Sequence, residues 1–127
     1  METWGERSAP IWSGPVIDCL AVTLLAMMIQ TEAGFEPYSG QVAVAYVAIN
    51  RVEQSGKPLL LVLRQPKHFF INPRLPITDQ VWFVAHAVLA KRVPDPTSGA
   101  DHFLNPHIRP VPGWYDERYV TVKIGRH

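Results

Sequence analysis

The segment that decides the fold is VAVAYVAI, residues 42–49, an apolar octet in the first half of the chain. Its apolar side chains cover the whole circumference of a helix, and such a helix is normally buried on every side. Ser39 is a good N-cap residue, and Ser55 and Gly56 favour a helix end. We therefore predict a helix from about Ser39 to Gln54 that forms the centre of the domain.

The apolar run before this octet, CLAVTLLAMMI at residues 19–29, predicts another helix. The helix is expected from about Pro15 to Ala33, because Pro15 suits a first turn and Gly34 and Pro37 stop a helix. It is predicted to be a buried core helix of the same domain.

A membrane span is the alternative for this apolar run, and the sequence argues against it. A span needs about 20 apolar residues, whereas Val16–Ile29 is shorter and carries Asp18. Glu2 and Glu6 also weaken a positively charged signal-peptide start. Cys19, the only cysteine, lies inside this apolar helix pattern and is predicted to be an inert buried thiol.

The second half of the chain predicts a shorter helix and some strands. LLLVLR, residues 59–64, fits either a short helix or a strand. Thr78 is a good cap for a helix that we expect to extend to Arg92. DHFL at residues 101–104 and RYVTVKIG at residues 118–125 have strand character. The prediction is a mostly helical α+β domain with a buried central helix and a small antiparallel sheet.

Composition narrows the classes of protein and of partner. The 127 residues fit one domain, which we place at residues 15–127 behind an irregular arm at residues 1–14. The net charge of +1 gives no basic surface for nucleic acid. One cysteine and the absence of a helical HExxH pattern predict no metal site, and no cofactor motif is present.

Glu32 is the candidate catalytic residue that the sequence offers. In helical steps it continues the apolar face of Leu25, Met28 and Ile29, and it lies in the last turn, where the helix dipole is negative. Desolvation and that dipole both raise a carboxyl pKa, which suits a general acid for glycosidic cleavage. The alternative is an ordinary solvated surface residue. For Glu36, the alternatives are a helix cap or an arginine partner.

The stretch TEAGFEPYSGQVAVAYVAINRV, residues 31–52, closely resembles the signature of the SleB-type cell-wall hydrolases, which include the spore-cortex lytic enzymes. That signature reads approximately Glu-Ala-x-Gly-Glu, a short loop, Gly-Gln-x-Ala-Val-Ala and Asn-Arg-Val. One departure is Gly34-Phe35 in place of the family's Arg-Gly. The matching positions are Glu32, Ala33, Glu36, Gly40, Gln41, Val42, Ala43, Val44, Asn50, Arg51 and Val52.

Later segments resemble the same family in the same order. They are QPKHFF at residues 65–70, SGADHFLNP at 98–106 and VTVKIGRH at 120–127, so the resemblance covers about residues 17–127. It implies a lysozyme-like fold and cleavage of the β-1,4 bond between N-acetylmuramic acid and N-acetylglucosamine in peptidoglycan. It further implies a lytic transglycosylase whose single catalytic glutamate is Glu32.

Several polar and aromatic residues are candidates for the substrate groove, because such grooves use aromatic faces and amide hydrogen bonds. For Phe69 and Phe103, ordinary core packing is an equal alternative. The candidates are Glu36, Tyr38, Gln41, Phe69, His102, Phe103 and Asn105.

Two other functions stay open at this stage. A hydrolytic muramidase would need a second carboxylate, for which Glu36, Asp79, Asp95 and Asp101 are the candidates. A virion structural or adaptor protein would keep the fold and dock through the N-terminal arm.

With no evident signal peptide, the protein is expected to be made in the cytoplasm and to act on the bacterial wall. A phage lytic protein, released at lysis or carried in the virion, fits that expectation.

Overall fold

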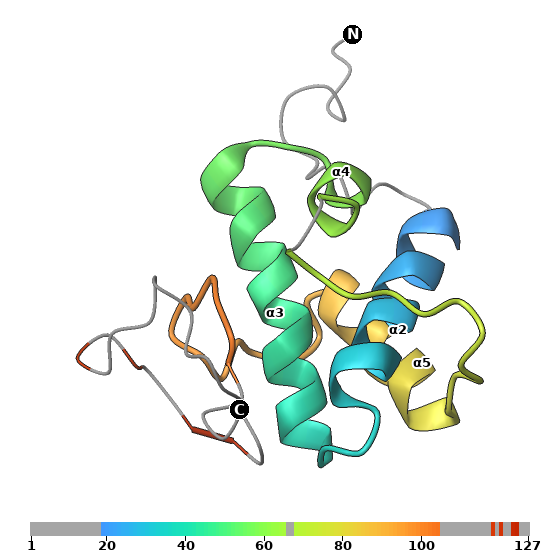
Figure 1. Cartoon of the computed structure of the whole chain (residues 1–127). Coiled ribbons are helices and arrows are strands. Elements are labelled where there is room, and N and C mark those ends of the chain that lie inside the picture. The colour runs from blue at the N-terminus through green and yellow to red at the C-terminus, as the bar shows by residue number, and fades with distance from the viewer. Residues whose placement is uncertain (1–18, 66–67, 105–117, 119, 121–122, 125–127) are drawn as a thin grey trace, which may run out of the picture.

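Four helices make up the regular structure of the described residues, which are 19–65, 68–104, 118, 120, 123 and 124 of a computed structural model (Figure 1). The arm at residues 1–14 and the expected helix start at Pro15 lie outside the described residues. The helices are α2 (Cys19–Ala33), α3 (Tyr38–Ser55), α4 (Leu59–Leu63) and α5 (Asp79–Leu89).

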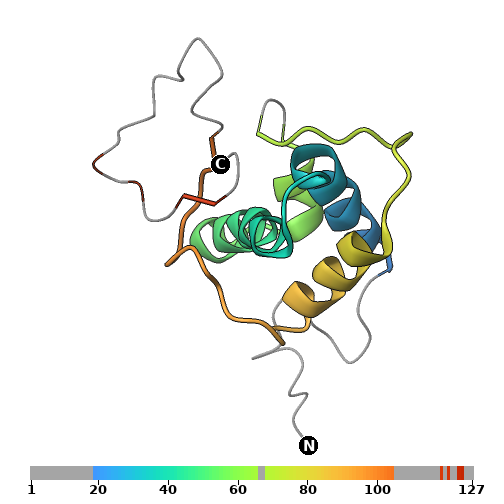
Figure 2. The same ribbon diagram turned by 90° about the horizontal axis from the view of Figure 1, so that it is seen from below.

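Helix α3 is the central helix that its sequence predicts. It packs against α2, α4 and α5, and α2 also packs against α5. Figure 2 shows α3 with α2 and α5 on one side and the segment of residues 95–104 on the other. Ala45 and Ala48 are fully buried in α3, as are Leu25 in α2 and Val84 in α5. The prediction of a helix buried on every side is confirmed, because all neighbouring elements bury their apolar faces against it.

The helix ends follow local residue chemistry at two of the three positions predicted for caps. Gly56 adopts the left-handed conformation, with φ 72°, and its amide bonds to Val52, so the predicted helix end is confirmed. The Thr78 side chain accepts a hydrogen bond from the Val81 amide at 3.2 Å, as predicted for an N-cap. The prediction for Ser39 is wrong, because Pro37 is the N-cap and Ser39 already lies inside the first turn.

These caps give a paired stability test. Thr78→Ala removes the side-chain acceptor for Val81 and should lower the free energy of unfolding by about 1 kcal/mol. Ser39→Ala, at an exposed position that caps nothing, should change it by less than about 0.5 kcal/mol. Denaturant unfolding of both variants measures the difference. Equal losses would contradict the assignment of the caps.

Two further details correct the sequence-based expectations. Cys19 is exposed at the first residue of α2, so the predicted buried thiol is wrong. Helix α5 ends at Leu89 instead of Arg92, because Lys91 adopts a positive φ of 54° that breaks the helix.

Residues 59–63 form a helix, which settles the open choice between helix and strand. No helix within the described residues is long and apolar enough to cross a membrane.

The predicted small antiparallel sheet is wrong for the described part of the chain, which contains helices and irregular segments but no strand. At residues 101–104 the physical reason is visible. The Ala100 carbonyl accepts from Asn50 Nδ2 at 2.8 Å, and the Asp101 carbonyl accepts from Arg51 Nε at 2.6 Å. Side chains of α3, and not a neighbouring strand, therefore bond to the carbonyls at the start of this segment. Much of the other expected strand, residues 118–125, lies outside the described residues.

Candidate active site

Glu32 lies in the last turn of α2, with its side chain partly buried. Burial raises the pKa of this carboxyl group to about 7, against a smaller lowering effect from a hydrogen bond with the Phe70 backbone amide. The direction agrees with the shift that the apolar stripe predicts, and desolvation is its larger cause. A carboxyl group with this pKa is half protonated near neutral pH and is able to donate its proton there.

The loop between α4 and α5 is fixed against the same turn of α2. Thr31 Oγ1 accepts from the Asn72 amide at 2.9 Å, and Gln30 Oε1 accepts from the Thr78 amide at 3.1 Å. Both acceptors precede Glu32 in α2, and Phe70 belongs to the same loop. These bonds hold the Phe70 amide at Glu32 and keep that side of the carboxyl group covered.

The turn between α2 and α3 is closed by Gln41, which is only 2% exposed. Its Nε2 donates to the carbonyls of Ala33 at 3.3 Å and Glu36 at 3.4 Å, and its Oε1 accepts from Gln80 Nε2 at 3.1 Å. One side chain thus ties the end of α2, the turn and α5 together. The structure places Gln41 inside the fold and Glu36 beside it, 9% exposed.

Gly40, in the first turn of α3, packs closely against Glu36. A Cβ atom on Gly40 would lie 3.1 Å from the Glu36 Cβ, which is tighter than most real contacts of this kind. The glycine therefore lets α3 begin directly against Glu36. The Gly-Gln pair at residues 40–41 shapes the turn that follows the candidate acid.

The candidate aromatic residues separate into two places. Phe69 is buried, and its ring centroid lies 6.1 Å from that of Phe103. Tyr38 is 39% exposed and instead pairs with Phe83 of α5, at 6.3 Å between centroids. The structure thus brings Phe69 and Phe103 together and gives Tyr38 a different neighbour. Asn105 lies outside the described residues.

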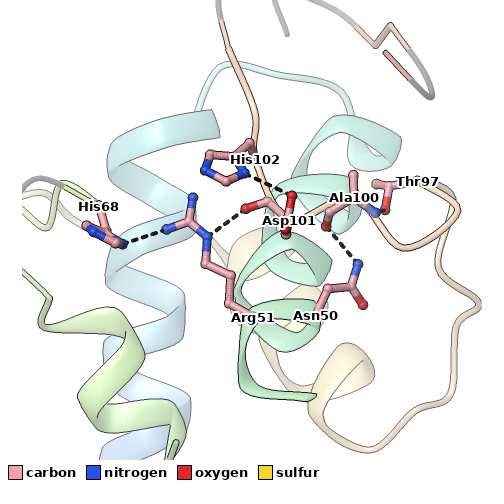
Figure 3. A network of polar contacts seen from close by, with 7 residues as sticks. All are labelled: Asn50, Arg51, His68, Thr97, Ala100, Asp101 and His102. Carbon is pink, nitrogen blue, oxygen red and sulfur yellow. Dashed lines mark hydrogen bonds and ion pairs between the residues drawn. The ribbon is translucent and has the colours of Figure 1, made fainter. Parts of the chain in front are cut away.

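A polar network links the C-terminal half of α3 to both flanking loops (Figure 3). Arg51 Nε donates to the Asp101 carbonyl, and its Nη1 donates to His68 Nδ1 at 3.2 Å. The guanidinium carbon also lies 4.6 Å from the centre of the Phe69 ring. His102 Nδ1 lies 2.9 Å from Asp101 Oδ1. Arg51 therefore joins two separate segments of the chain, one with His68 and Phe69 and the other with Asp101.

Asn50 and Asp95 anchor the same loop from the other side. Asn50 Nδ2 donates to Asp95 Oδ2 at 3.0 Å, and Asp95 also accepts from Thr97 and from the Gly99 amide. Burial acts to raise the pKa of Asp95, but these hydrogen bonds outweigh it and leave the pKa lowered. Asp95 is thus a structural carboxylate whose oxygens are engaged within the loop.

Sequence reasoning gave Asn50 and Arg51 no role beyond matching a motif. The available signal was an amide and a cation at the end of an otherwise apolar central helix, where burial requires partners. Among the described residues, no three His, Cys, Asp or Glu side chains are grouped so as to hold a metal ion.

Comparison with known proteins agrees with the sequence motif. The sequence model of a family described as Cell Wall Hydrolase matches residues 35–127, a segment that begins just after Glu32. A spore cortex-lytic enzyme from Halalkalibacterium halodurans is 30% identical over 115 residues, which cover 84% of this chain and 33% of the relative. One from Bacillus cereus is 31% identical over 115 residues, covering 84% of this chain and 42% of the relative.

The chain spans less than half the length of these relatives. No solved structure matches it. The family match extends over most of the sequence and includes the Gly-Gln turn and the Asn-Arg pair described above. The chain therefore belongs to the SleB-type cell wall hydrolase family.

Proposed function

We propose that this chain cleaves the glycan strands of peptidoglycan, between N-acetylmuramic acid and N-acetylglucosamine, as a lytic transglycosylase. The observation that carries the proposal is Glu32, a partly buried carboxyl group with a pKa raised to about 7. Membership of a family of cell wall hydrolases and similarity to spore cortex-lytic enzymes support the choice of substrate. An origin in a phage and a partner in a virion stay predictions.

In the proposed reaction, Glu32 acts first as an acid and then as a base. Its proton passes to the bridging oxygen as the bond between that oxygen and the muramic anomeric carbon breaks. The C6 hydroxyl of the same muramic acid bonds to the anomeric carbon and returns its proton to Glu32. The product is a 1,6-anhydro sugar, and no water is consumed. The attacking hydroxyl is already tethered, so no second carboxylate is required.

A hydrolytic muramidase is the alternative, and it needs a second carboxylate to hold water or to attack. Asp95 is unsuited, since its Oδ1 accepts from Thr97 and its Oδ2 accepts from Asn50 and Gly99. Asp101 is paired with His102, and Asp79 lies in the first turn of α5. Glu36, in the turn between α2 and α3, is the remaining candidate among those the sequence offered.

The products distinguish these mechanisms. Digestion of peptidoglycan in water enriched in oxygen-18, followed by mass spectrometry, should give anhydro-muramic ends that are one water lighter than reducing ends and carry no label. Labelled reducing ends would contradict transglycosylation and favour the muramidase. Folded protein that cuts none of several wall types would contradict the proposed function and favour a structural protein that keeps the fold.

Glu36→Gln tests the need for a second carboxylate directly. We expect a loss of less than about tenfold in rate, compared with the hundredfold or more that removing a general acid or base produces. The amide keeps the size of a side chain that packs closely against Gly40, so the turn should be preserved. Turbidity clearance and thermal unfolding measure both properties. Loss of all activity in well-folded protein would support the two-carboxylate mechanism.

A further inference from the structure

A pocket lies between α3, α4 and the segment that contains Asp101. It has room for about 250 Å³ and is lined mainly by Arg51, Gln54, Gln65, His68, Asp101 and His102. A complete small-molecule site usually has a volume of about 300–1,000 Å³. This pocket therefore suits one substituent of a larger ligand better than a whole ligand.

Arg51 is a partly buried cation whose contacts are with neutral groups. They are the Asp101 carbonyl at 2.6 Å, the His68 ring nitrogen at 3.2 Å and the face of the Phe69 ring at 4.6 Å. Within the described residues it makes no ion pair with a carboxylate, and the Asp101 carboxylate pairs with His102 instead. Burial lowers the pKa of Arg51, with an opposing effect from Asp101. An anion that enters the pocket would favour the charged guanidinium and so oppose the effect of desolvation.

Arg51 and His68 both line the pocket, and each has an N–H group besides those in the hydrogen bonds of Arg51 to Asp101 and His68. Arginine only donates, so His68 Nδ1 must accept, and its proton lies on Nε2. Figure 3 shows the third guanidinium nitrogen of Arg51 on the side of His102. The Arg51 Nη2 group and the His68 Nε2–H thus provide N–H donors for a carboxylate.

The loop that contains Phe70 brings the pocket close to Glu32 in space. His68 lines the pocket, and Phe70, whose amide bonds to Glu32, follows two residues later. Two residues span at most about 7 Å. A sugar whose bond is cut at Glu32 would therefore carry its side substituent within reach of the pocket.

We propose that the pocket around Arg51 binds a carboxylate on the substituent of the muramic acid, in the lactyl group or in the peptide stem attached to it. This inference rests on the proposed cleavage of peptidoglycan and adds what the enzyme recognises next to the cut bond. Arg51 and His68 donate to the carboxylate, and the glycan lies across Glu32.

The test compares cleavage of four glycan preparations by the full chain. Two preparations are strands that keep their peptide stems and strands stripped by an amidase, which exposes the lactyl carboxylate. The other two are the same strands with their carboxylates capped as methylamides. We expect capping to lower kcat/KM about tenfold or more, as for a lost hydrogen bond to a charged group. A capping effect on stripped strands identifies the lactyl group as the source, and an effect confined to strands with stems identifies the peptide.

Three variants relate the effect to the pocket. Arg51→Gln should bring the ratio of rates on uncapped and capped strands close to one. His68→Ala, at an exposed position, should lower that ratio even if Arg51→Gln fails to fold. Arg64→Gln removes the same charge from an exposed residue just after α4, outside the pocket lining, and should keep the wild-type ratio.

The outcomes separate this inference from the function on which it rests. Equal cleavage of capped and uncapped strands by the wild type would overturn the carboxylate pocket and leave peptidoglycan cleavage standing. A capping effect that persists in His68→Ala and Arg51→Gln would place the carboxylate elsewhere and also overturn it. No cleavage of any preparation by folded protein would overturn both proposals.

Discussion

Glu32→Gln should abolish cleavage of peptidoglycan, with a loss of at least about a hundredfold and up to about ten-thousandfold, the contribution of a positioned general acid or base. The amide keeps the size of the side chain but has no acidic proton for the bridging oxygen. Release of soluble muropeptides, followed by chromatography, measures the residual rate. A Glu32→Gln protein that clears cell walls at near the wild-type rate would show that Glu32 is not the acid.

A matched control separates chemistry from folding. Glu53→Gln makes the same substitution at an exposed residue of α3, whose ion pair with Lys91 at 3.3 Å is also exposed. An exposed pair of this kind contributes about 1 kcal/mol or less, so activity and stability should both be retained. A similar activity loss in both variants would indicate a general effect of lost charge.

The difference in stability between Glu32→Gln and the wild type should depend on pH in a defined direction. The folded pKa of Glu32, about 7, lies above the reference value of 4.5, so the folded wild type binds more protons between these values. The stability that the Glu32 carboxyl group contributes to the wild type is therefore present below pH 4.5 and is lost as pH rises towards 7. Because the side chain is partly exposed, the advantage of Glu32→Gln above pH 7 should be on the order of 1 kcal/mol.

The rate of cleavage by the wild type should fall on the alkaline side with an apparent pKa of about 7. Only the protonated Glu32 donates to the leaving oxygen, and its population falls tenfold for each pH unit above the pKa. At pH 9 the rate should therefore be about a hundredth of its plateau. Initial rates between pH 5 and 9 at constant ionic strength measure the profile. A profile that stays flat to pH 9, or that declines from about pH 4.5, would contradict the assignment.

The position of Glu32 on an apolar stripe was sufficient to predict the direction of its pKa shift. A helix repeats its faces every 3.6 residues, so an apolar stripe tells which side of the last turn will be buried. The partner that opposes the shift, the Phe70 amide, was not predictable. It comes from a loop that Thr31 and Gln30 hold in place, and such contacts depend on where the loop passes.

For the candidate groove residues, too, the sequence indicates the residue type, and the packing of the fold decides the contacts. Gln41 was recognised as part of a motif, but its hydrogen bonds to Ala33, Glu36 and Gln80 belong to the turn and to a distant helix. Tyr38 was grouped with Phe69 by residue type, whereas the fold gives it Phe83 as its aromatic neighbour. Residue type predicts what a side chain is able to contact, and only the packing of helices decides which contact forms.

The sequence by itself determined the central helix, the Thr78 cap and the end at Gly56, because each depends on residues within a turn or two of one another. The tertiary structure alone decided that residues 101–104 form no strand. Their environment is set by Asn50 and Arg51, whose bonds to Ala100 and Asp101 join positions 50 residues apart in the chain. Strand propensity describes a local preference, and a carbonyl group bonds to whichever donor the packed helices bring to it.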